Sequence, residues 1–534
     1  RSFTPLGGEL RLELTPSLAS TVLQGLTAMD AFPKDFTEPV ISRLMANAAA
    51  YRALKGFNLQ APDLQSSLER AIRQDLGRLL QLQQTDGGWN WGEATDRQSD
   101  PRLTAHALIA LHQVSQGGFF VTADAVNRAQ QFLKARLVSV RPELPSGALD
   151  DETLMTFALQ QSGMTDLNLD ALYDLRERLT PWGKAMLAMS LEGIQPGDER
   201  ARTLLSDLAG LAQRSATGAH WQTGEVNWRS WATPIYTTAV VVYALASVDP
   251  ASPLLVDAVR YLVLHRRPAG CWNSSYDSAW ALLGLSQALQ STGDLQASYS
   301  YQADLNGGLF ASGNVDGPQG ALKGVTVTAP LSQLLTDAPN ALEISRTAGN
   351  GRLYYRAYLQ VSRAAAEAPA YSRGIFLQRE YFRGGVDCRR QVCAPVQEGE
   401  VGNPDGLVVR LTLTLPEDLY YVVVEDFIPA GAEIINPNLK TSRQGFAAPD
   451  LPQPENDLLT PFRNGWGWWH FGQAQIYDDR VRWVAPYLPA GSYTLVYRLS
   501  PVLAGDFQVI PAHAYQYYFP EVEGRSKGDL LILR

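Results

Sequence analysis

The sequence predicts a protein of mixed α and β structure, in which a closed α/α toroid is inserted into a small β domain and followed by a β-sandwich. Apolar residues recur with the period of a helix from Pro16 to about Leu289. Near Gln296 the period changes to short alternating runs separated by Gly, Asn and Pro, which is typical of strands. A chain of 534 residues, 45% of them hydrophobic, is long enough for several packed domains.

Three stretches of the helical part repeat one pattern, in which a Trp close to a Gly precedes a Thr-Ala or Ser-Ala step and an apolar helix. The first is QLQQTDGGWNWG with the SDPRLTAHALIALHQ segment that follows, and the others begin at His220 and Ala269. Such repeats indicate stacked helical hairpins rather than one catalytic pocket. We expect the Trp residues of this part to pack in the core and at the rim, namely Trp89, Trp91, Trp182, Trp221, Trp228, Trp231, Trp272 and Trp280.

Prolines and capping residues predict about twelve helices, and therefore about six antiparallel hairpins. The expected helix starts lie near Pro16, Pro39, Pro62, Pro101, Thr122, Asp151, Leu167, Pro181, Asp198, Ala232, Pro253 and Ser274.

The strand prediction begins at Gly8 to Leu14, where ELRLEL alternates, and we expect this strand to complete the β block that begins at residue 296. We interpret AAAEAPAYS, residues 364–372, as a linker, and the alternating runs after it predict a β-sandwich. The predicted domains are residues 1–14 with 296–364 for the small β domain, 15–295 for the toroid and 365–534 for the sandwich.

The net charge of −9 and the lack of a Lys/Arg-rich run argue against nucleic-acid binding. No run of about 18 apolar residues is present, so we expect no membrane span in this chain, and we expect a monomer. The chain begins at Arg1 without a signal-peptide pattern, and we interpret it as a processed piece.

The three cysteines leave the redox state open. Cys388 and Cys393 flank the basic turn RRQV, where a local disulfide and two free thiols are equal alternatives, because geometry decides between them. We interpret Cys271 as a small packed residue rather than a reactive one.

Several segments, taken together, resemble the C-terminal part of bacterial α2-macroglobulin-like proteins, which are relatives of the complement thioester proteins. LTPSLASTVLQGLTAMDAFPKDFTEPVISRLMAN resembles the start of their thioester domain, and LNG, APL and GRLYYRAYL resemble their split CUB-like domain. VEDFIPAGAEIINPNL, YDDRVRWVAPYLPAGSYTLVYRLSPVLAGDF and YFPEVEGRS resemble the final macroglobulin domain and are the most specific of these segments. The resemblance covers essentially the whole chain.

The thioester motif of that family is Cys-x-Glu-Gln followed closely by Ser-Arg, and this chain departs from it. Phe36 stands at the Cys position and Pro39 at the Gln position. A thioester needs a sulfur and a carboxamide carbon, which these two side chains do not supply. We therefore expect a thioester-less chain with no catalytic residue, metal site or cofactor. The positions that still match the motif are Thr37, Glu38, Ser42 and Arg43.

The resemblance implies an extracytoplasmic protein, periplasmic, bound to the cell envelope or secreted, whose partners are the proteases that it restrains. Without a thioester, that restraint would be non-covalent and steric, exerted by the full-length parent with its bait region. A structural protein of the envelope that inhibits nothing is an alternative that the sequence does not separate.

An enzyme built on the toroid is the alternative from another class. QxxDGGW resembles the QW repeats of terpene cyclases, but the acidic cluster Asp150-Asp151-Glu152 reads as a helix start. A polysaccharide lyase or glycosidase would need paired carboxylates. Candidates are Glu93, Asp96 and Asp100, but acids in such a polar loop usually face water. An enzyme should show a deep acidic or aromatic cavity at the toroid axis, whereas an inhibitor should have a filled one.

Two further features have a simpler interpretation than a binding site. His106 and His112 are six residues apart and fall on different sides of a helix, which does not suit a metal site, and we expect His106 to be a packed or surface residue. We interpret the aromatic run NGWGWWHF, Asn464 to Phe471, as a loop folded over the edge of the sandwich, with a partner or carbohydrate patch as the alternative.

Overall fold

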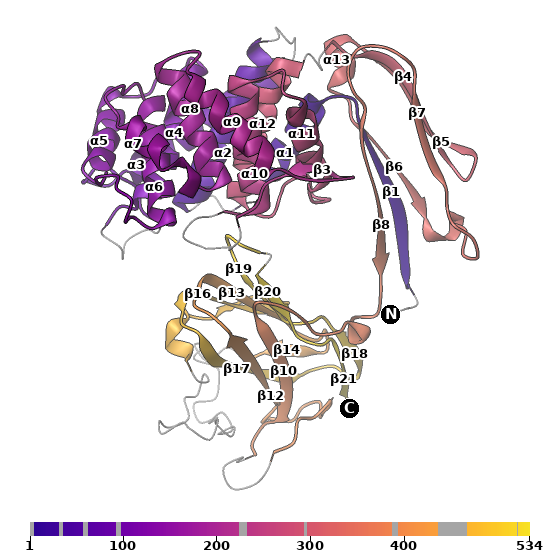
Figure 1. Ribbon diagram of the computed structural model, residues 1–534. Helices are drawn as coiled ribbons and strands as arrows, with labels where there is room; N and C mark the ends of the chain where they lie inside the picture. The colour runs from indigo at the N-terminus through magenta and orange to yellow at the C-terminus, as the bar shows by residue number, and fades with distance from the viewer. Residues whose placement is uncertain are drawn as a thin grey trace. The chain divides into compact units, whose positions relative to one another are not determined.

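The computed structural model describes residues 5–30, 32, 36–56, 62–91, 98–223, 232–292, 296–386, 393–435, 467–520 and 522–534. The chain divides into two compact units, one of residues 9–359 and one of residues 1–8 with 360–534. The first unit holds the twelve helices of the toroid and, among its described residues, three small sheets, and the second is built mainly of strands (Figure 1).

Twelve α-helices lie in the described part between residues 18 and 292, and eleven of them begin within two residues of the predicted start. The prediction for α6 was wrong by five residues: the helix begins at Ser146, directly after Pro145, and not at Asp151. The bounds are α1 Leu18–Met29, α2 Thr37–Gly56, α3 Pro62–Leu82, α4 Pro101–Gln116, α5 Ala123–Lys134, α6 Ser146–Gln161, α7 Leu169–Asp174, α8 Pro181–Ile194, α9 Glu199–Leu211, α10 Pro234–Val248, α11 Pro253–Leu264 and α12 Ser275–Thr292.

The even-numbered helices α2 to α12 form an inner ring. Each packs against the next, and α12 returns to pack against α2, so the ring is closed. The odd-numbered helices lie outside, each against its neighbour in sequence. The inner helix α10 is buried at every position from Ile235 to Ala246, whereas the outer helix α3 buries only one stripe. The predicted closed toroid of six helical hairpins is therefore confirmed.

The three Trp repeats form one structural device, which we call the tryptophan clamp: Trp89, Trp221 and Trp272, each in the turn between an outer and an inner helix. The backbone N–H of each Trp donates to a buried hydroxyl in the first turns of the inner helix, at 3.0, 3.1 and 3.0 Å respectively. Each indole N–H donates to a carbonyl in the last turns of the preceding outer helix, at 2.8, 2.7 and 2.9 Å. The clamp thus joins the two helices of a hairpin at their turn. The acceptors on the inner helices are Thr104, Thr238 and Ser278.

Glycines of the repeats allow the tight turn that precedes the Trp of the clamp. Gly87 has a φ of +92°, and a Cβ there would lie 2.5 Å from the Arg128 carbonyl oxygen. Gly270 has a φ of +98° and approaches the Gln24 carbonyl oxygen in the same way. Only Gly adopts this left-handed backbone at no steric cost. The predicted packing role of the Trp residues is confirmed for Trp89, Trp182, Trp221, Trp272 and Trp280, all of them fully buried. Trp228 and Trp231 lie outside the described residues.

Two three-stranded sheets complete the first unit, and they confirm that the strand before the toroid pairs with strands after it. β1 runs antiparallel to β6, with Leu12 opposite Val327, and the sheet has the order β6-β1-β8. The second sheet has the order β5-β4-β7, and apolar side chains of both sheets share one core. The bounds are β1 Gly7–Thr15, β4 Ser298–Leu305, β5 Gly308–Asp316, β6 Val325–Pro330, β7 Leu342–Arg346 and β8 Tyr354–Ser362, with short pieces β2 Gln213–Ser215, β3 Gly218–His220, α13 Gly317–Ala321 and a 3₁₀ turn Leu331–Gln333.

A buried carboxylate joins this β structure to the toroid. Glu13 of β1 accepts hydrogen bonds from Arg356 of β8 at 2.9 Å and from Arg266, which follows α11, at 3.2 Å. Tyr358 donates to the same carboxylate at 3.1 Å. Because all its partners are in place, the buried charge of Glu13 is compensated.

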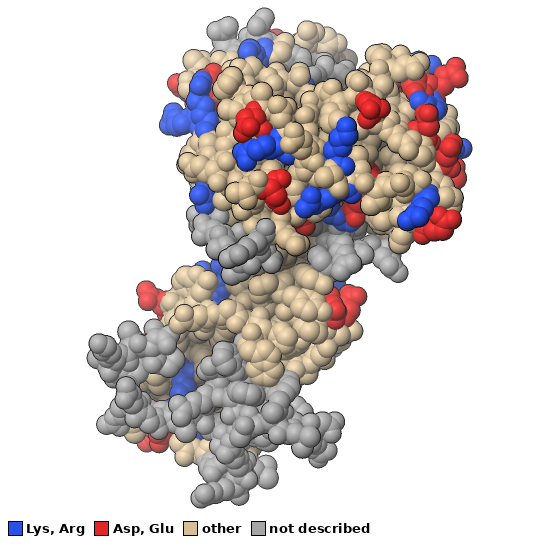
Figure 2. Space-filling view, turned by 90° about the vertical axis from the view of Figure 1, so that its left-hand side faces the viewer, with Lys and Arg blue, Asp and Glu red and all other residues tan. Residues whose placement is uncertain are grey.

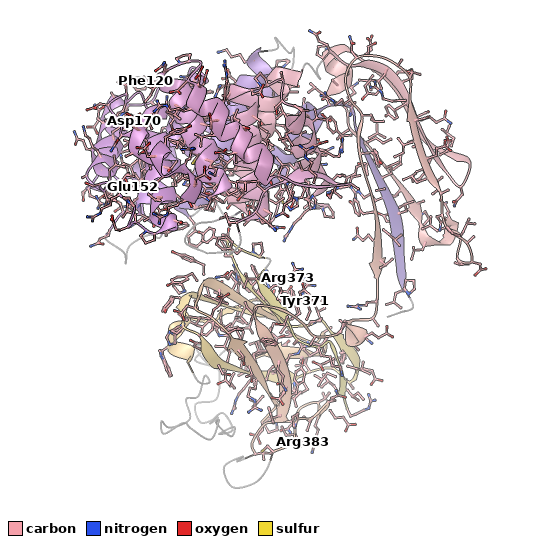
Figure 3. The ribbon with its side chains drawn as sticks, viewed as in Figure 1. Phe120, Glu152, Asp170, Tyr371, Arg373 and Arg383 are labelled. Carbon is pink, nitrogen blue, oxygen red and sulfur yellow. The ribbon has the colours of Figure 1, made fainter. Side chains whose placement is uncertain are left out.

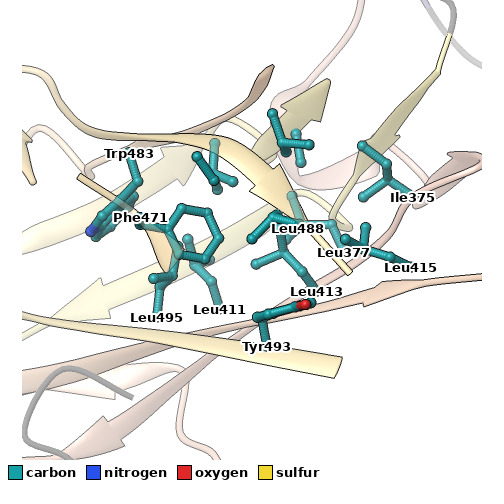
Figure 4. Close-up of a cluster of buried hydrophobic side chains, with 14 of the residues drawn as sticks. Ile375, Leu377, Leu411, Leu413, Leu415, Phe471, Trp483, Leu488, Tyr493 and Leu495 are labelled. Carbon is teal, nitrogen blue, oxygen red and sulfur yellow. The ribbon is translucent and has the colours of Figure 1, made fainter. Parts of the chain in front are cut away.

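The second unit contains the predicted β-sandwich. A four-stranded sheet β10-β12-β17-β14 faces a six-stranded sheet β15-β16-β13-β19-β20-β9, and a third has the order β11-β21-β18. Apolar side chains of the two large sheets interdigitate, among them Leu411, Phe471 and Trp483 (Figure 4). The bounds are β9 Tyr371–Arg373, β10 Phe376–Arg383, β11 Glu398–Gly399, β12 Leu407–Leu415, β13 Leu419–Phe427, β14 Ala432–Ile434, β15 Gln475–Ile476, β16 Arg480–Leu488, β17 Gly491–Pro501, β18 Gly505–Val509, β19 His513–Gln516, β20 Glu523–Arg525 and β21 Asp529–Leu533, with 3₁₀ turns at Ala365–Glu367 and Trp468–His470. A further 3₁₀ turn, Arg176–Arg178, lies between α7 and α8 of the first unit.

The interpretation of residues 364–372 as a linker was wrong. Residues Tyr371–Arg373 form β9, which pairs with β20, and the Ala368 carbonyl oxygen accepts from the Gly528 N–H at 2.9 Å. These contacts are hydrogen bonds of the backbone, which residues of any type can form. The Ala- and Pro-rich composition therefore did not predict them.

A buried ion pair joins the two large sheets. Arg379 of β10 donates to Asp426 of β13 at 2.6 Å, and both side chains are completely buried. Arg379 also donates to Asp529 at 2.9 Å, and the hydroxyl of Tyr497 donates to Asp426 at 2.8 Å. Removing one partner of such a network leaves an uncompensated charge, which costs about 3–5 kcal/mol.

The charges of the first unit alternate in sign across its surface on the face that Figure 2 shows, where Lys and Arg side chains are interspersed with Asp and Glu. Among the described residues, no helix combines the length and the apolar character that crossing a membrane requires.

We predict that Thr238→Val weakens the toroid. The substitution keeps the shape of the side chain but removes the oxygen that accepts the Trp221 N–H, and a buried donor without a partner costs about 1–3 kcal/mol. The free energy of unfolding from urea titration should fall by that amount. The matched control is Thr203→Val on the exposed face of α9, where the hydroxyl bonds back to Glu199. Equal effects of the two substitutions would contradict a special role for the clamp.

Candidate functional site

The positions of the Cys-x-Glu-Gln motif, which are Phe36 to Pro39 in this chain, lie at the start of the inner helix α2, which begins at Thr37. Phe36 immediately precedes the helix, and 50% of its surface is exposed. Thr37, Glu38 and Pro39 are buried, and the Phe36 carbonyl oxygen accepts the Val40 N–H at 3.3 Å. Pro39 is in the first turn, where a residue without an N–H is tolerated, as we predicted.

Glu38 closes the ring of inner helices. One carboxylate oxygen accepts from Ser42 of its own helix at 2.5 Å, and the other accepts from Ser275 at 2.6 Å. Ser275 is the first residue of α12, so this contact joins the last inner helix to the first. Burial raises the pKa of the Glu38 carboxyl to about 7, while the two hydroxyls and the charge of Arg43 act in the opposite direction.

Arg43 also has a structural role. Its guanidinium forms a buried ion pair with Asp75 of the outer helix α3, with distances of 2.9 and 3.3 Å. The positions that match the thioester motif thus hold α2 against α3 and α12. Phe36 presents an apolar ring to solvent beside them, without a sulfur.

Aromatic side chains from four inner helices meet across the ring at this end. Tyr236 of α10 stacks on Tyr276 of α12 with ring centroids 4.7 Å apart, and it also contacts Trp280 at 5.6 Å and Trp182 of α8 at 5.7 Å. His106 of α4 contacts Tyr276 at 5.1 Å. These described side chains therefore contact one another across the ring of inner helices.

His106 is a packed residue, as predicted. Its Nδ1 lies 2.7 Å from the Arg102 carbonyl oxygen, which can only accept, so Nδ1 carries a proton. Its Nε2 then accepts from the Tyr276 hydroxyl at 3.1 Å. Burial lowers the pKa of His106 to about 4, so the ring is neutral at pH 7. Burial has the same effect on His112, and no group of three potential metal ligands occurs in the described part of the chain.

Comparison with known proteins gives one consistent family. Residues 374–521 match the family described as the bacterial alpha-2-macroglobulin MG10 domain. An alpha-2-macroglobulin homologue of Nostoc sp. is 22% identical over the whole chain, and an alpha-2-macroglobulin of Xylella fastidiosa is 26% identical over 96% of it. The chain spans 27% and 30% of the length of these relatives.

Solved structures agree with this result. The native alpha-2-macroglobulin of Escherichia coli has a TM-score of 0.64 at 18% identity, and the match covers 100% of this chain and 31% of that one. The Salmonella alpha-2-macroglobulin reacted with methylamine has a TM-score of 0.63 at 18% identity, with 99% of this chain and 32% of that chain covered. The chain is alpha-2-macroglobulin-like.

The acidic cluster of this alpha-2-macroglobulin-like toroid is structural. Asp150 is buried and accepts the N–H and the hydroxyl of Thr180, both at 3.0 Å, which ties α6 to the start of α8. Glu152 accepts the Val138 N–H at 3.2 Å (Figure 3). Burial raises the pKa of both carboxyls to about 7. Our interpretation of the cluster as a helix start was wrong because these acids lie inside α6 and bond to other segments.

Of the acids near Trp91, Asp100 is among the described residues. Asp100 is the N-cap of α4, accepting from the Leu103 N–H at 2.9 Å, and Trp91 donates to it at 3.1 Å. The expectation that Asp100 simply faces water was therefore wrong. Glu93 and Asp96 lie outside the described residues.

The cysteines and the aromatic run are also placed in part. Cys393 is disulfide-bonded, while Cys271 is a free thiol whose pKa is raised by burial. Cys388 lies outside the described residues, so its pairing stays a prediction. In the aromatic run, Phe471 is buried in the sandwich core and Trp469 is 45% exposed. The run is thus folded in at one end, and Asn464 lies outside the described residues.

A cavity of about 540 Å³ in the second unit was not predicted from the sequence. It is lined by residues of β9, β10, β12 and β20, by Ala370 before β9 and by Lys527 after β20. These segments are far apart in sequence, and part of one was assigned to a linker. Pairing between the segments would have been the only signal, and a single sequence does not contain it.

We predict that Glu38→Gln removes a pH dependence of stability. Between pH 4.5, the ordinary pKa of a Glu carboxyl, and pH 7, the folded chain keeps the Glu38 proton that the unfolded chain loses. The free energy of unfolding therefore falls as pH rises through this window, by about 3 kcal/mol, and is independent of this group below and above it. Gln stays uncharged throughout.

The measurement is urea unfolding of both proteins at a series of pH values. The contributions of all other titrating groups cancel when the free energies of unfolding of the two proteins are subtracted. The stability of the Gln variant relative to the parent should rise by about 3 kcal/mol from pH 4.5 to pH 7. Parallel curves for the two proteins would contradict the raised pKa of Glu38.

Proposed function

We propose that this chain is part of an alpha-2-macroglobulin-type protease inhibitor that acts without a thioester. The observation that carries the proposal is the start of α2, where Phe36 and Pro39 occupy the Cys and Gln positions of the motif that the sequence resembles. Of the Cys, Glu and Gln of the motif, only the Glu is present, as Glu38, and it is committed to the contact with Ser275 that closes the ring.

The chemistry of a thioester requires a thiol sulfur bonded to the carbonyl carbon of a former Gln side chain. Phe36 and Pro39 provide neither atom. Of the other cysteines, Cys271 is half-buried in the turn before α12, and Cys393 is already oxidised. A proton on a buried thiol is hard to remove, and the protonated thiol is not nucleophilic. These observations support an inhibitor that forms no covalent bond to its target.

Restraint of a protease is then steric. In this mechanism an exposed bait is cleaved, the protein rearranges, and large substrates are kept from an active site that small substrates still reach. The partner is therefore a protease, and binding rather than catalysis carries the function. The aromatic side chains that meet across the ring of inner helices favour this proposal over an enzyme of carbohydrate or terpenoid chemistry.

We place the protein outside the cytoplasm, in the periplasm, at the cell envelope or in the medium, in a role of bacterial defence. The disulfide of Cys393 supports an oxidising compartment, because cytosolic reductants keep thiols reduced.

We predict that methylamine does not react with this chain. An amine that attacks a thioester carbonyl forms an amide, breaks the C–S bond and releases a thiol. Here the mass of the chain and its number of free thiols should stay unchanged after incubation with methylamine. The Salmonella alpha-2-macroglobulin, whose crystal structure was obtained after reaction with methylamine, is the positive control. A mass gain of one amine adduct together with one new thiol in this chain would disprove the proposal.

We also predict a difference between large and small substrates for a protease restrained by the protein that contains this chain. Cleavage of a large protein substrate should fall strongly, while cleavage of a short chromogenic peptide should stay close to that of the free protease. The reason is that a steric barrier excludes by size and leaves the catalytic residues untouched.

The other outcomes separate the alternatives. Equal loss on both substrates would indicate a blocked active site and contradict steric restraint. Equal retention on both would favour a structural protein of the envelope. A complex of the protein with the protease that survives boiling in SDS would be covalent, and it would contradict the loss of the thioester.

A further inference from the structure

The groove of about 540 Å³ in the second unit lies beside the terminal strand of a sheet. β10 is the terminal strand of its sheet, and four consecutive residues of it, 376–379, line the groove. Thr414 and Thr412 of β12, which lie opposite Phe376 and Gln378 in the ladder, also line the groove, so it extends from β10 over the face of the sheet that is turned away from the core. β9, the terminal strand of the six-stranded sheet, forms another wall.

The charged residues that line the groove are all cationic, although the chain as a whole carries a net charge of −9. Arg379 is committed to Asp426 and Asp529. Arg525 is exposed and pairs with Glu523 at 3.0 Å. Lys527 is exposed, and no described residue forms an ion pair with its ammonium group.

The groove also has an apolar side. Tyr371 is 41% exposed and Phe376 is 56% exposed, which is unusual for large aromatic side chains in a folded sandwich. Arg373 lies over the Tyr371 ring, 6.0 Å from its centroid, and Figure 3 shows the two residues next to each other on β9. Cations and aromatic rings therefore share one recess, with the polar side chains of Gln378 and Thr414 between them.

We propose that this groove binds an extended acidic segment of a partner protein. Arg379 is fully paired, so the cations that a ligand can reach are Arg525 and Lys527, which are exposed two residues apart at one end of the lining and favour an acidic ligand. The exposed aromatic rings require apolar side chains between the carboxylates of that ligand. An edge strand accepts an extended chain along its length, and the cavity volume is in the range of ligand sites in proteins. The inference concerns the second unit and does not depend on protease restraint.

The experiment measures fluorescence anisotropy of a labelled, end-blocked octapeptide in which Glu alternates with Val, titrated with the 534-residue chain. The same peptide with Gln in place of Glu is the reference. We expect saturable binding of the Glu peptide, at least tenfold weaker binding of the Gln peptide, and a loss of affinity as salt rises from low to physiological ionic strength.

Two variants of the groove and two matched controls locate the site. Lys527→Glu and Phe376→Ser should each weaken binding of the Glu peptide about tenfold or more. The controls are Lys134→Glu at the end of α5 and Phe120→Ser, both exposed in the first unit, and each should change affinity less than about twofold (Figure 3). All four positions are exposed, and thermal unfolding midpoints within a few degrees of the parent show that each variant is folded.

Each remaining outcome overturns the proposal. Undetectable binding at millimolar chain concentration, equal affinity for the Glu and Gln peptides, or equal effects of Lys134→Glu and Lys527→Glu would do so. Tighter binding of a single-stranded oligonucleotide, with the same dependence on Lys527 and Phe376, would assign the groove to another class of partner. Protease restraint is measured in a separate assay, so failure of one proposal leaves the other intact.

Discussion

The toroid depends on satisfying a buried backbone N–H at the turn of a helical hairpin. Such a group costs free energy unless it finds an acceptor, and water does not reach it here. The tryptophan clamp supplies a Thr or Ser hydroxyl from the inner helix, and the indole N–H of the same Trp caps a carbonyl of the outer helix. One residue thus fixes both helices of a pair, and three of the six hairpins use it.

Closing the ring is a second constraint, because the first and last inner helices are far apart in sequence. Glu38 and Ser275 are 237 residues apart and meet at 2.6 Å. Burial disfavours the charged form of the Glu38 carboxyl and raises its pKa to about 7, so this contact between the two helices has a cost in desolvation. The site that the resemblance associates with a reactive bond is therefore used for a structural contact in which the carboxyl is half-protonated near neutral pH.

The helices, most strands and the closed toroid could be predicted from the sequence because they depend on local periodicity and capping. The clamp was visible as a repeat, although its hydrogen bonds were not. What could not be predicted are contacts between distant segments. Asp150 bonds to Thr180, so an apparent helix start is a helix interior. Tyr371 pairs with β20, so an apparent linker is an edge strand. The composition of a segment does not indicate which distant segment it pairs with.

The distribution of unsatisfied groups separates the roles of the two units. In the toroid, the acids and the histidine that suggested chemistry are buried and paired: Glu38 with two hydroxyls, Asp150 with Thr180, His106 with Tyr276. Groups held in this way stiffen a scaffold, and they are not available to a substrate. In the second unit, by contrast, the cation of Lys527 and the ring of Phe376 face solvent beside the terminal strand of a sheet. The polar groups of the toroid are thus committed to its own structure, whereas the sandwich exposes the groove for which we proposed a partner.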